Sequence, residues 1–170
     1  MEKSNMDVHF SSNSDEWCTP QWLYDELNEE FNFEWDIATS TVSFNSKTGK
    51  YACYTEERDA INQDWSQDFK VGYCNPPYSR GKQKQFVRKA VEQMRKGVTS
   101  VFLIPARTDT KAWHTYIWDK TKQCPREGVE VRFLEGRLKF EIDGKPMLDK
   151  NGKPQSAPFP SCIVVFRGME

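Results

Sequence analysis

The chain has 170 residues, which fits one domain of ordinary size. Its net charge of -1 hides an asymmetry, because residues 1–70 hold 5 Lys and Arg against 15 Asp and Glu, a balance of -10, whereas residues 71–170 hold 19 against 10, a balance of +9. This asymmetry predicts that the second half faces a polyanion, unless folding interleaves the two halves and cancels the field.

The composition argues against three broad classes of protein. No apolar run approaches ~20 residues and the first residues lack a hydrophobic leader, so we expect a soluble cytoplasmic protein with no membrane partner. The two histidines, His9 and His114, are too few and too far apart to predict a metal site. The cysteines are odd in number and lack C-x-x-C spacing, which predicts reduced, mostly buried thiols. They are Cys18, Cys53, Cys74, Cys124 and Cys162.

The chain begins with a polar segment, residues 1–14, which we expect to be a flexible arm ahead of a single domain at 15–170. A helix is predicted over about 20–31, with Thr19 as its N-cap and Pro20 at its first position. A helix start with free N–H groups could simply be a good cap, or it could receive a carboxylate.

Two strands are predicted next, one over about 31–38 that ends near Asp36 and one over 50–55. The loop after Asp36 contains no glycine, so small side chains must pass any ligand there. Asp59 follows the second strand and is either a ligand contact or a solvated acid at a helix start. Because only 39 residues separate Asp36 from Asn75 and a βαβ unit needs ~30 or more, at least one crossover helix must be shortened or missing.

A buried strand over Val71–Cys74 runs directly into Asn75, Pro76, Pro77 and Tyr78. Two prolines make a rigid turn, which would project its residues beyond the carboxyl end of the strand, where ligands of open α/β sheets bind. An amide and a carbonyl held there could accept both hydrogens of a nucleobase amine and draw its lone pair out of the ring, while the tyrosine face holds the base. The alternative is that the prolines only form a rigid loop.

A helix is predicted from about 79 to 96, with Arg80, Lys82 and Lys84 placed for phosphate contacts beside the turn. The next buried strand, 98–104, stops at Pro105 and is followed by Arg107, which could contact DNA backbone or cofactor or form a structural ion pair.

The remaining chain is predicted to form a strand over 130–134 and a hairpin between 137–140 and 160–167. Two near-identical turn signals between them predict a protruding, lysine-bearing loop within 140–160, our first candidate for reading DNA. Arg137, Lys139 and Phe140 at its start are further candidate DNA contacts, and Phe140 or Phe159 could supply a second stacking face.

Several motifs in this order resemble the phage-type DNA N6-adenine methyltransferase (Dam) family. The motifs are Glu16-Trp17-x-Thr19-Pro20, Asp36-x-Ala38, Asp64-Trp65, Asn75-Pro76-Pro77-Tyr78-Ser79, Pro105-Ala106-Arg107-Thr108-Asp109, Gly136-Arg137-Leu138-Lys139-Phe140 and Ala157-Pro158-Phe159-Pro160-Ser161. The resemblance implies a pared-down α/β, Rossmann-like methyltransferase fold in a single domain with a C-terminal β-hairpin, too short for a separate recognition domain.

The resemblance also implies S-adenosylmethionine as cofactor, double-stranded DNA as partner and no metal. Asn75, Pro76, Pro77 and Tyr78 would be catalytic. The implied cofactor-binding residues are Trp17, Thr19, Pro20, Asp36, Ala38, Asn45 and Asp59. Two alternatives stay open: an enzyme of the same signature that acts on RNA or protein glutamine, and a catalytically silent DNA-binding or antirestriction protein. Nothing in the sequence indicates an oligomeric state.

Overall fold

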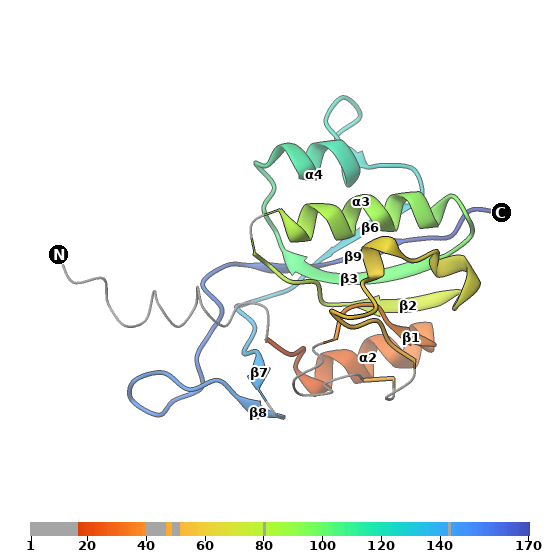
Figure 1. Cartoon of the computed structure of the whole chain (residues 1–170). Coiled ribbons are helices and arrows are strands. Elements are labelled where there is room, and N and C mark those ends of the chain that lie inside the picture. The colour runs from red at the N-terminus through yellow and green to blue at the C-terminus, as the bar shows by residue number, and fades with distance from the viewer. Residues whose placement is uncertain (1–16, 40–46, 49–51, 80, 143) are drawn as a thin grey trace.

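The computed structural model describes residues 17–39, 47–48, 52–79, 81–142 and 144–170. The predicted arm at 1–14 therefore lies outside the described residues. A five-stranded mixed sheet with the order β1-β2-β3-β9-β6 forms the centre of the molecule (Figure 1). Its strands are β1 (Trp35–Asp36), β2 (Val71–Cys74), β3 (Thr99–Pro105), β9 (Ser161–Phe166) and β6 (Val129–Phe133). The first three are parallel, and β9 runs antiparallel to both of its neighbours.

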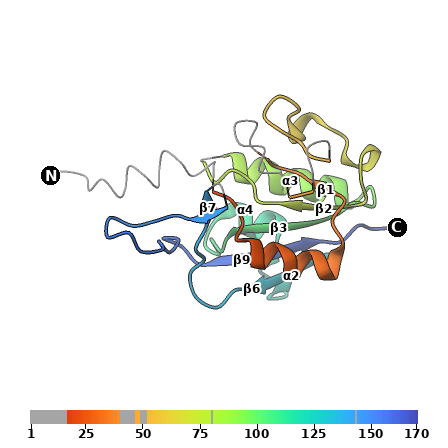
Figure 2. The same ribbon diagram turned by 90° about the horizontal axis from the view of Figure 1, so that it is seen from below.

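Helices cover both faces of the sheet (Figures 1 and 2). The helices α3 (Lys82–Met94) and α4 (Lys111–Tyr116) pack on one face, and α2 (Gln21–Phe31) packs on the other. Since successive strand residues point to opposite faces, β3 sends Phe102 and Ile104 toward α3, and Val101 and Leu103 toward α2. Burial on both faces explains why β3 and β9 are continuous apolar runs.

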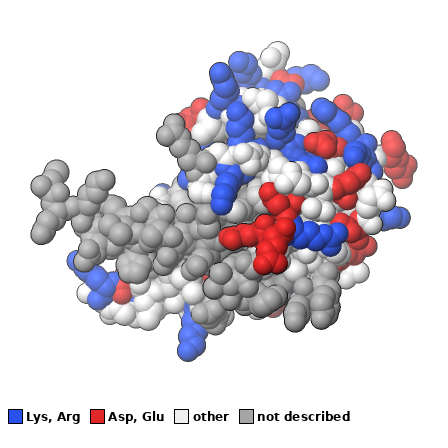
Figure 3. Space-filling view, in the orientation of Figure 1, with Lys and Arg blue, Asp and Glu red and all other residues white. Residues whose placement is uncertain are grey.

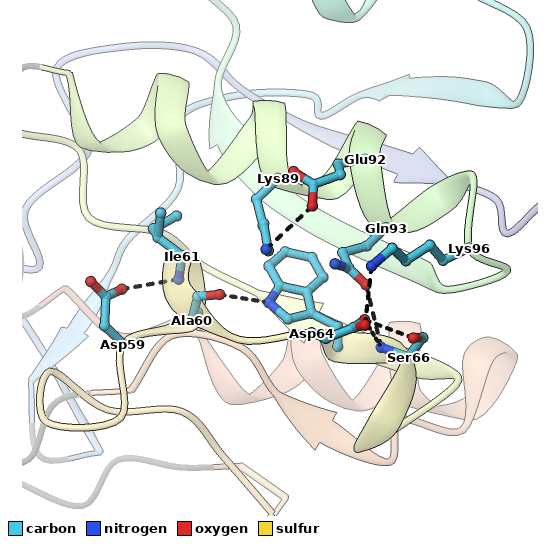
Figure 4. Close-up of polar contacts among 10 residues, drawn as sticks. Asp59, Ala60, Ile61, Asp64, Ser66, Lys89, Glu92, Gln93 and Lys96 are labelled. Carbon is cyan, nitrogen blue, oxygen red and sulfur yellow. Dashed lines mark hydrogen bonds and ion pairs between the residues drawn. The ribbon is translucent and has the colours of Figure 1, made fainter.

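Two single-turn 3-10 helices, η1 (Ala60–Asn62) and η2 (Trp65–Gln67), stand in the described chain between β1 and β2. Figure 4 shows how they dock on α3: Ser66 N donates to Gln93 Oε1 (3.3 Å), and Lys96 Nζ lies 3.0 Å from Asp64 Oδ2. The indole of Trp65, fully buried, donates to Ala60 O (2.9 Å). The prediction of a shortened crossover is therefore confirmed for the described residues.

The predicted start of the first helix was wrong by one position. Pro20, with φ -54° and ψ 134°, is the N-cap of α2, and no side chain caps it. Thr19 does not cap the helix, because its hydroxyl instead forms a short hydrogen bond with the hydroxyl of Tyr73, and both residues are buried.

The predicted strands near the site are shorter than expected. Pairing over 31–38 is limited to Trp35–Asp36, since α2 extends to Phe31. In the described part of 50–55 the pairing is a single parallel bridge between Asp36 and Cys53, supported by Tyr54 N donating to Asp36 O (2.9 Å).

The predicted C-terminal hairpin is also wrong. Residues 137–140 form no strand, and β9 pairs with β3 and β6 instead. The apolar β9 is buried along its whole length, which an edge position beside 137–140 would not provide. Two small hairpins, β4 (Trp118–Asp119) with β5 (Cys124–Pro125) and β7 (Glu141–Ile142) with β8 (Lys145–Pro146), lie outside the main sheet.

Of the five cysteines, Cys53, Cys74 and Cys162 are buried, as the sequence predicted for most of the thiols. No helix among the described residues is both long enough and apolar enough to span a bilayer.

Candidate active site at the proline corner

Residues Asn75–Tyr78, here called the proline corner, leave the sheet at the carboxyl end of β2. The neighbouring parallel strands end at the same edge, and Ile37 N donates to Tyr73 O (2.8 Å) just before the corner. Gly72 permits this close strand packing, because a Cβ there would come within 2.5 Å of the Phe69 ring. The corner therefore stands where open α/β sheets bind ligands.

The side-chain amide of Asn75 is held in one orientation. Its Nδ2 donates to the carbonyl of Trp17 (2.7 Å), and the hydroxyl of Tyr78 donates to its Oδ1 (2.7 Å). Since a carbonyl can only accept, the Trp17 contact fixes which end of the amide is the donor. An amide oxygen has two lone pairs, so Oδ1 keeps acceptor capacity beyond the Tyr78 contact. No described residue donates a hydrogen bond to the carbonyl of Pro76, the second expected acceptor.

A pocket of about 330 Å³, here called the β1-side pocket, opens beside the corner. Its volume lies within the range of about 300–1,000 Å³ typical of small-molecule sites. Its described wall consists of Ile37, Ala38, Thr39, Tyr54, Thr55, Glu56, Asp59, Ala60, Ile61, Asn75, Pro77, Lys82, Gln85 and Phe86. The structure thus brings the predicted residues Ala38 and Asp59 together with the corner.

Asp59 has two roles in this wall. Its carboxylate caps η1 by accepting from Ile61 N (3.0 Å), and Asn62 Nδ2 lies 3.4 Å from its other oxygen. The residue therefore starts a short helix and lines the pocket at the same time, so the two interpretations of the sequence do not compete.

Sequence reasoning missed Thr39 and Ile61 as wall residues. Thr39 is 9% exposed, and its hydroxyl is buried without a hydrogen-bond partner in the described structure. A buried polar atom in a pocket wall is available to a ligand, because leaving it unpaired is unfavourable. The signal that could have identified it is the loop after Asp36, which contains no glycine. A small side chain with a hydroxyl lies there in place of a bare glycine backbone.

Asp36 lies behind the pocket and not among its described wall residues. Backbone N–H groups of Ala38 (3.4 Å) and Lys47 (3.1 Å) donate to its carboxylate. Burial nevertheless raises the pKa of Asp36 to about 7, because desolvation outweighs these hydrogen bonds.

Other predicted cofactor residues are also absent from the described wall. Trp17, Thr19 and Pro20 are buried beside α2, and Trp17 reaches the site through its carbonyl contact with Asn75. Asn45 lies outside the described residues.

On its other side the corner is packed by aromatic rings. The ring of Tyr78, 7% exposed, meets Trp17, Phe140 and Phe159 edge-on, with centroid distances of 6.3, 6.1 and 5.6 Å. Burial raises the pKa of the Tyr78 phenol, and its one hydroxyl hydrogen has two acceptors in reach, Asn75 Oδ1 at 2.7 Å and the Leu103 carbonyl at 3.1 Å. Phe140 is 2% exposed, so in this structure it is a core residue of this cluster and not a surface contact for DNA.

A second, smaller hollow of about 180 Å³, the α4-side pocket, lies between α3 and α4. Its described wall is Tyr78, Ser79, Gly81, Gln83, Lys84, Val87, Arg107, Thr110, Ala112, Trp113 and Ile117. Two predicted DNA contacts, Lys84 and Arg107, are therefore in the wall of a pocket that also includes Tyr78.

The other predicted DNA contacts are dispersed. Lys82 is in the wall of the β1-side pocket, whereas Arg137 and Lys139 are exposed on the segment before β7. Arg137 Nη1 lies 3.5 Å from the carbonyl of Ala157. Arg80 lies outside the described residues.

Folding cancels part of the charge asymmetry between the two halves of the chain. Lys96 pairs with Asp64, and Arg132 contacts both carboxylate oxygens of Glu30 at 2.6 and 2.8 Å. In contrast, Lys84 and Arg107 form no ion pair with any described carboxylate. Figure 3 shows Lys and Arg side chains concentrated toward the upper part of one face, where α3 and α4 lie.

In the parts of the chain that the structure describes, no group of three or more His, Cys, Asp or Glu residues is placed to hold a metal ion. The site therefore combines the fixed amide of Asn75 in the wall of the β1-side pocket with two cations, Lys84 and Arg107, in the wall of the α4-side pocket.

Comparison with known proteins agrees with this geometry. A family model described as DNA N-6-adenine-methyltransferase (Dam) matches residues 7–170. The DNA N-6-adenine-methyltransferase of Haemophilus phage HP1 (strain HP1c1) is 29% identical over 160 residues, which cover 91% of this chain and 82% of that protein. The protein of the same description from Escherichia phage T1 is 29% identical over 130 residues, 76% of this chain and 49% of that protein, so the match spans about half of it. No solved structure matches the chain.

Proposed function

The chain belongs to the DNA N-6-adenine-methyltransferase (Dam) family, and from that premise we propose that its proline corner transfers a methyl group to the N6 amine of an adenine flipped out of DNA. The family makes the chain a DNA adenine methyltransferase. The observation that carries the assignment of the site is the fixed amide of Asn75 in the wall of the β1-side pocket.

At the corner, Asn75 Oδ1 and the Pro76 carbonyl accept the two hydrogens of the adenine amine. These contacts favour a nitrogen whose lone pair is no longer delocalised into the ring, which is the state that reacts. Pro77 keeps the turn rigid, and the Trp17 carbonyl keeps the amide oxygen directed to the base. Since these groups are positioned before the substrate arrives, little reorganisation accompanies the reaction.

The β1-side pocket is the proposed site of S-adenosylmethionine. When bound, this cofactor supplies an activated methyl group on a sulfonium, and no metal is needed. Asp59 and the unpartnered hydroxyl of Thr39 would hold its polar groups, with Ala38 and Ile61 against its flat face. Asp36 directly precedes the wall residue Ile37, and its ionised carboxylate would stabilise a cationic ligand.

The flipped adenine would stack on Tyr78 once the aromatic rings packed on it move aside, and Lys84 and Arg107 in the wall of the α4-side pocket are available for the flanking phosphates. Three parallel strands that end at one site support a Rossmann-like arrangement of this pared-down fold. The phage relatives support action in the cytoplasm of an infected bacterium.

The decisive experiment compares Asn75→Ala with the wild-type protein. We expect methyl transfer to plasmid DNA to fall about 100- to 1,000-fold, the usual loss when one polarising group of a transition state is removed. Binding of S-adenosylhomocysteine, measured by calorimetry, should persist, because Asn75 contributes only one part of the pocket wall. Gln67→Ala, an exposed amide in η2, is the matched control and should keep full activity.

The substrates in the same assay test the acceptor. Labelled cofactor is offered with DNA, tRNA and cell extract, and sequencing of the methylated plasmid identifies the base and the site. Transfer to tRNA or protein without transfer to DNA, or normal transfer by Asn75→Ala, would contradict the proposal.

A further inference from the structure

An arm formed by residues 138–142 and 144–157 projects from the carboxyl edge of the sheet, as Figures 1 and 2 show. Backbone hydrogen bonds connect its two sides from base to tip: Ala157 N to Leu138 O (2.8 Å), Met147 N to Phe140 O (3.0 Å) and Gln155 N to Met147 O (2.7 Å). The projecting segment is therefore a hydrogen-bonded structure along its described length and not an open loop.

The base of the arm is joined to the proline corner. Cys18 and Glu141 exchange backbone hydrogen bonds at 2.8 and 3.0 Å, next to the Trp17 carbonyl that holds Asn75. Phe140 packs in the aromatic cluster around Tyr78. A duplex that reaches the corner from this edge must therefore pass beside the arm.

The tip of the arm is preorganised by Asp149. Its carboxylate accepts from Asn151 N (2.8 Å) and Lys153 N (3.0 Å), while Gly152 N donates to its carbonyl (3.0 Å). Gly152 has φ 75°, a conformation that favours glycine. This turn holds Leu148 beside Pro154 with 60% of the leucine exposed to solvent.

Three large apolar side chains are exposed in the described structure: Leu148, Trp22 (56%) and Phe133 (64%). Trp22 is on α2. This helix has four acidic residues and no basic residue, so its charge repels a polyanion. Phe133 is the last residue of β6 in the central sheet. Only Leu148 projects from the body, and residues 144–155 around it contain three lysines against one aspartate.

We propose that Leu148 is a wedge that enters the duplex as the target adenine leaves it, with Lys150 and Lys153 on the adjacent phosphates. This inference rests on the proposed function, because only a flipped base leaves a gap to fill. Extruding a base disrupts its stacking, and an apolar side chain inserted between base steps replaces part of that contact. Neither lysine pairs with a described carboxylate, so both are free to contact phosphate.

The test uses the site found by plasmid sequencing in two duplexes, one fully paired and one with the target adenine opposite an abasic position. Leu148→Ala should methylate the paired duplex about tenfold or more slowly, yet stay within about twofold of wild type on the unpaired one, where extrusion costs least. Leu148→Met should restore the rate, because it keeps an apolar wedge. Phe133→Ala is the matched control and should be unchanged on both.

The phosphate contacts have a separate readout. Lys150→Gln and Lys153→Gln should each lower the slope of log affinity against log salt by about one, for the same duplex. Wild-type rates for Leu148→Ala on the paired duplex, or an equal loss on both duplexes, would overturn the wedge. If the wild-type protein methylates neither duplex, the proposed function itself fails.

Discussion

The two sides of the proline corner are built differently. The side toward β1 is an open pocket of about 330 Å³, with small side chains and the buried hydroxyl of Thr39 in its wall. The other side is occupied by protein, because the Tyr78 ring is packed by Trp17, Phe140 and Phe159. On the proposed function, the difference means that the cofactor side is preformed, whereas the aromatic rings on the other side must rearrange for a purine to lie on the tyrosine.

The closed side is where the largest effect on stability is expected. Phe140→Ala should lower the free energy of unfolding by about 3–5 kcal/mol, because its ring is almost wholly buried and leaves a cavity. Phe159→Ala should cost clearly less, since this ring is only partly buried in the same cluster. Denaturant unfolding of both variants measures the difference. Equal losses would show that Phe159 is as much a core residue as Phe140, and that the closed side is not adjustable.

The polar region behind the open side should make stability depend on pH. The carboxyl of Asp36 binds its proton more tightly in the folded protein, where its pKa is about 7, than at its ordinary value of 3.8. Its contribution to stability is therefore present at low pH and is lost as the pH rises through this window, by up to about 1.4 kcal/mol per unit. Above about pH 7 both states are ionised and this contribution stops changing.

Asp36→Asn isolates this contribution. The variant should lose the downward trend in unfolding free energy between about pH 4 and pH 7 that Asp36 causes in the wild-type protein. Parallel pH profiles for the two proteins would contradict the assignment of a proton to the buried carboxyl.

The smallest effect is expected for a substitution in the wall of the β1-side pocket. Asp59→Ala should weaken binding of S-adenosylhomocysteine about tenfold, the usual size of one charged or hydrogen-bonding contact to a ligand. Calorimetry measures this directly. Gln63→Ala, a change at the end of the same 3-10 helix outside the described wall, controls for distortion of η1 and should leave affinity unchanged.

The position of the corner could be predicted from the sequence because the features that determine it are local. A buried strand followed by two prolines can hardly be anything but a rigid turn at a sheet edge, and Asn75 and Pro77 do line a pocket. The shortened crossover followed from chain length alone, since the 39 residues between Asp36 and Asn75 are too few for two successive βαβ units of ~30 residues or more each.

The failures have a common cause, which is that they depend on distant partners. Thr19 has the local signature of a cap, but a buried tyrosine 54 positions away takes its hydroxyl. Likewise, the strand partner of β9 could not be chosen from alternation alone, because a strand buried on both faces fits any interior place in the sheet. The role of the Trp17 carbonyl was invisible because a backbone atom carries no sequence signal.

The position of β9 has a consequence for the synthesis of the protein. This strand follows every other strand of the described residues, yet it lies between β3 and β6 and pairs with both. Until β9 has emerged from the ribosome, one edge of the apolar β3 has unpaired backbone N–H and C=O groups. A strand of another nascent chain could pair with this edge. We therefore expect the yield of folded protein to depend on how quickly the ribosome completes the last part of the described chain, and chaperones that shield strand edges should raise it.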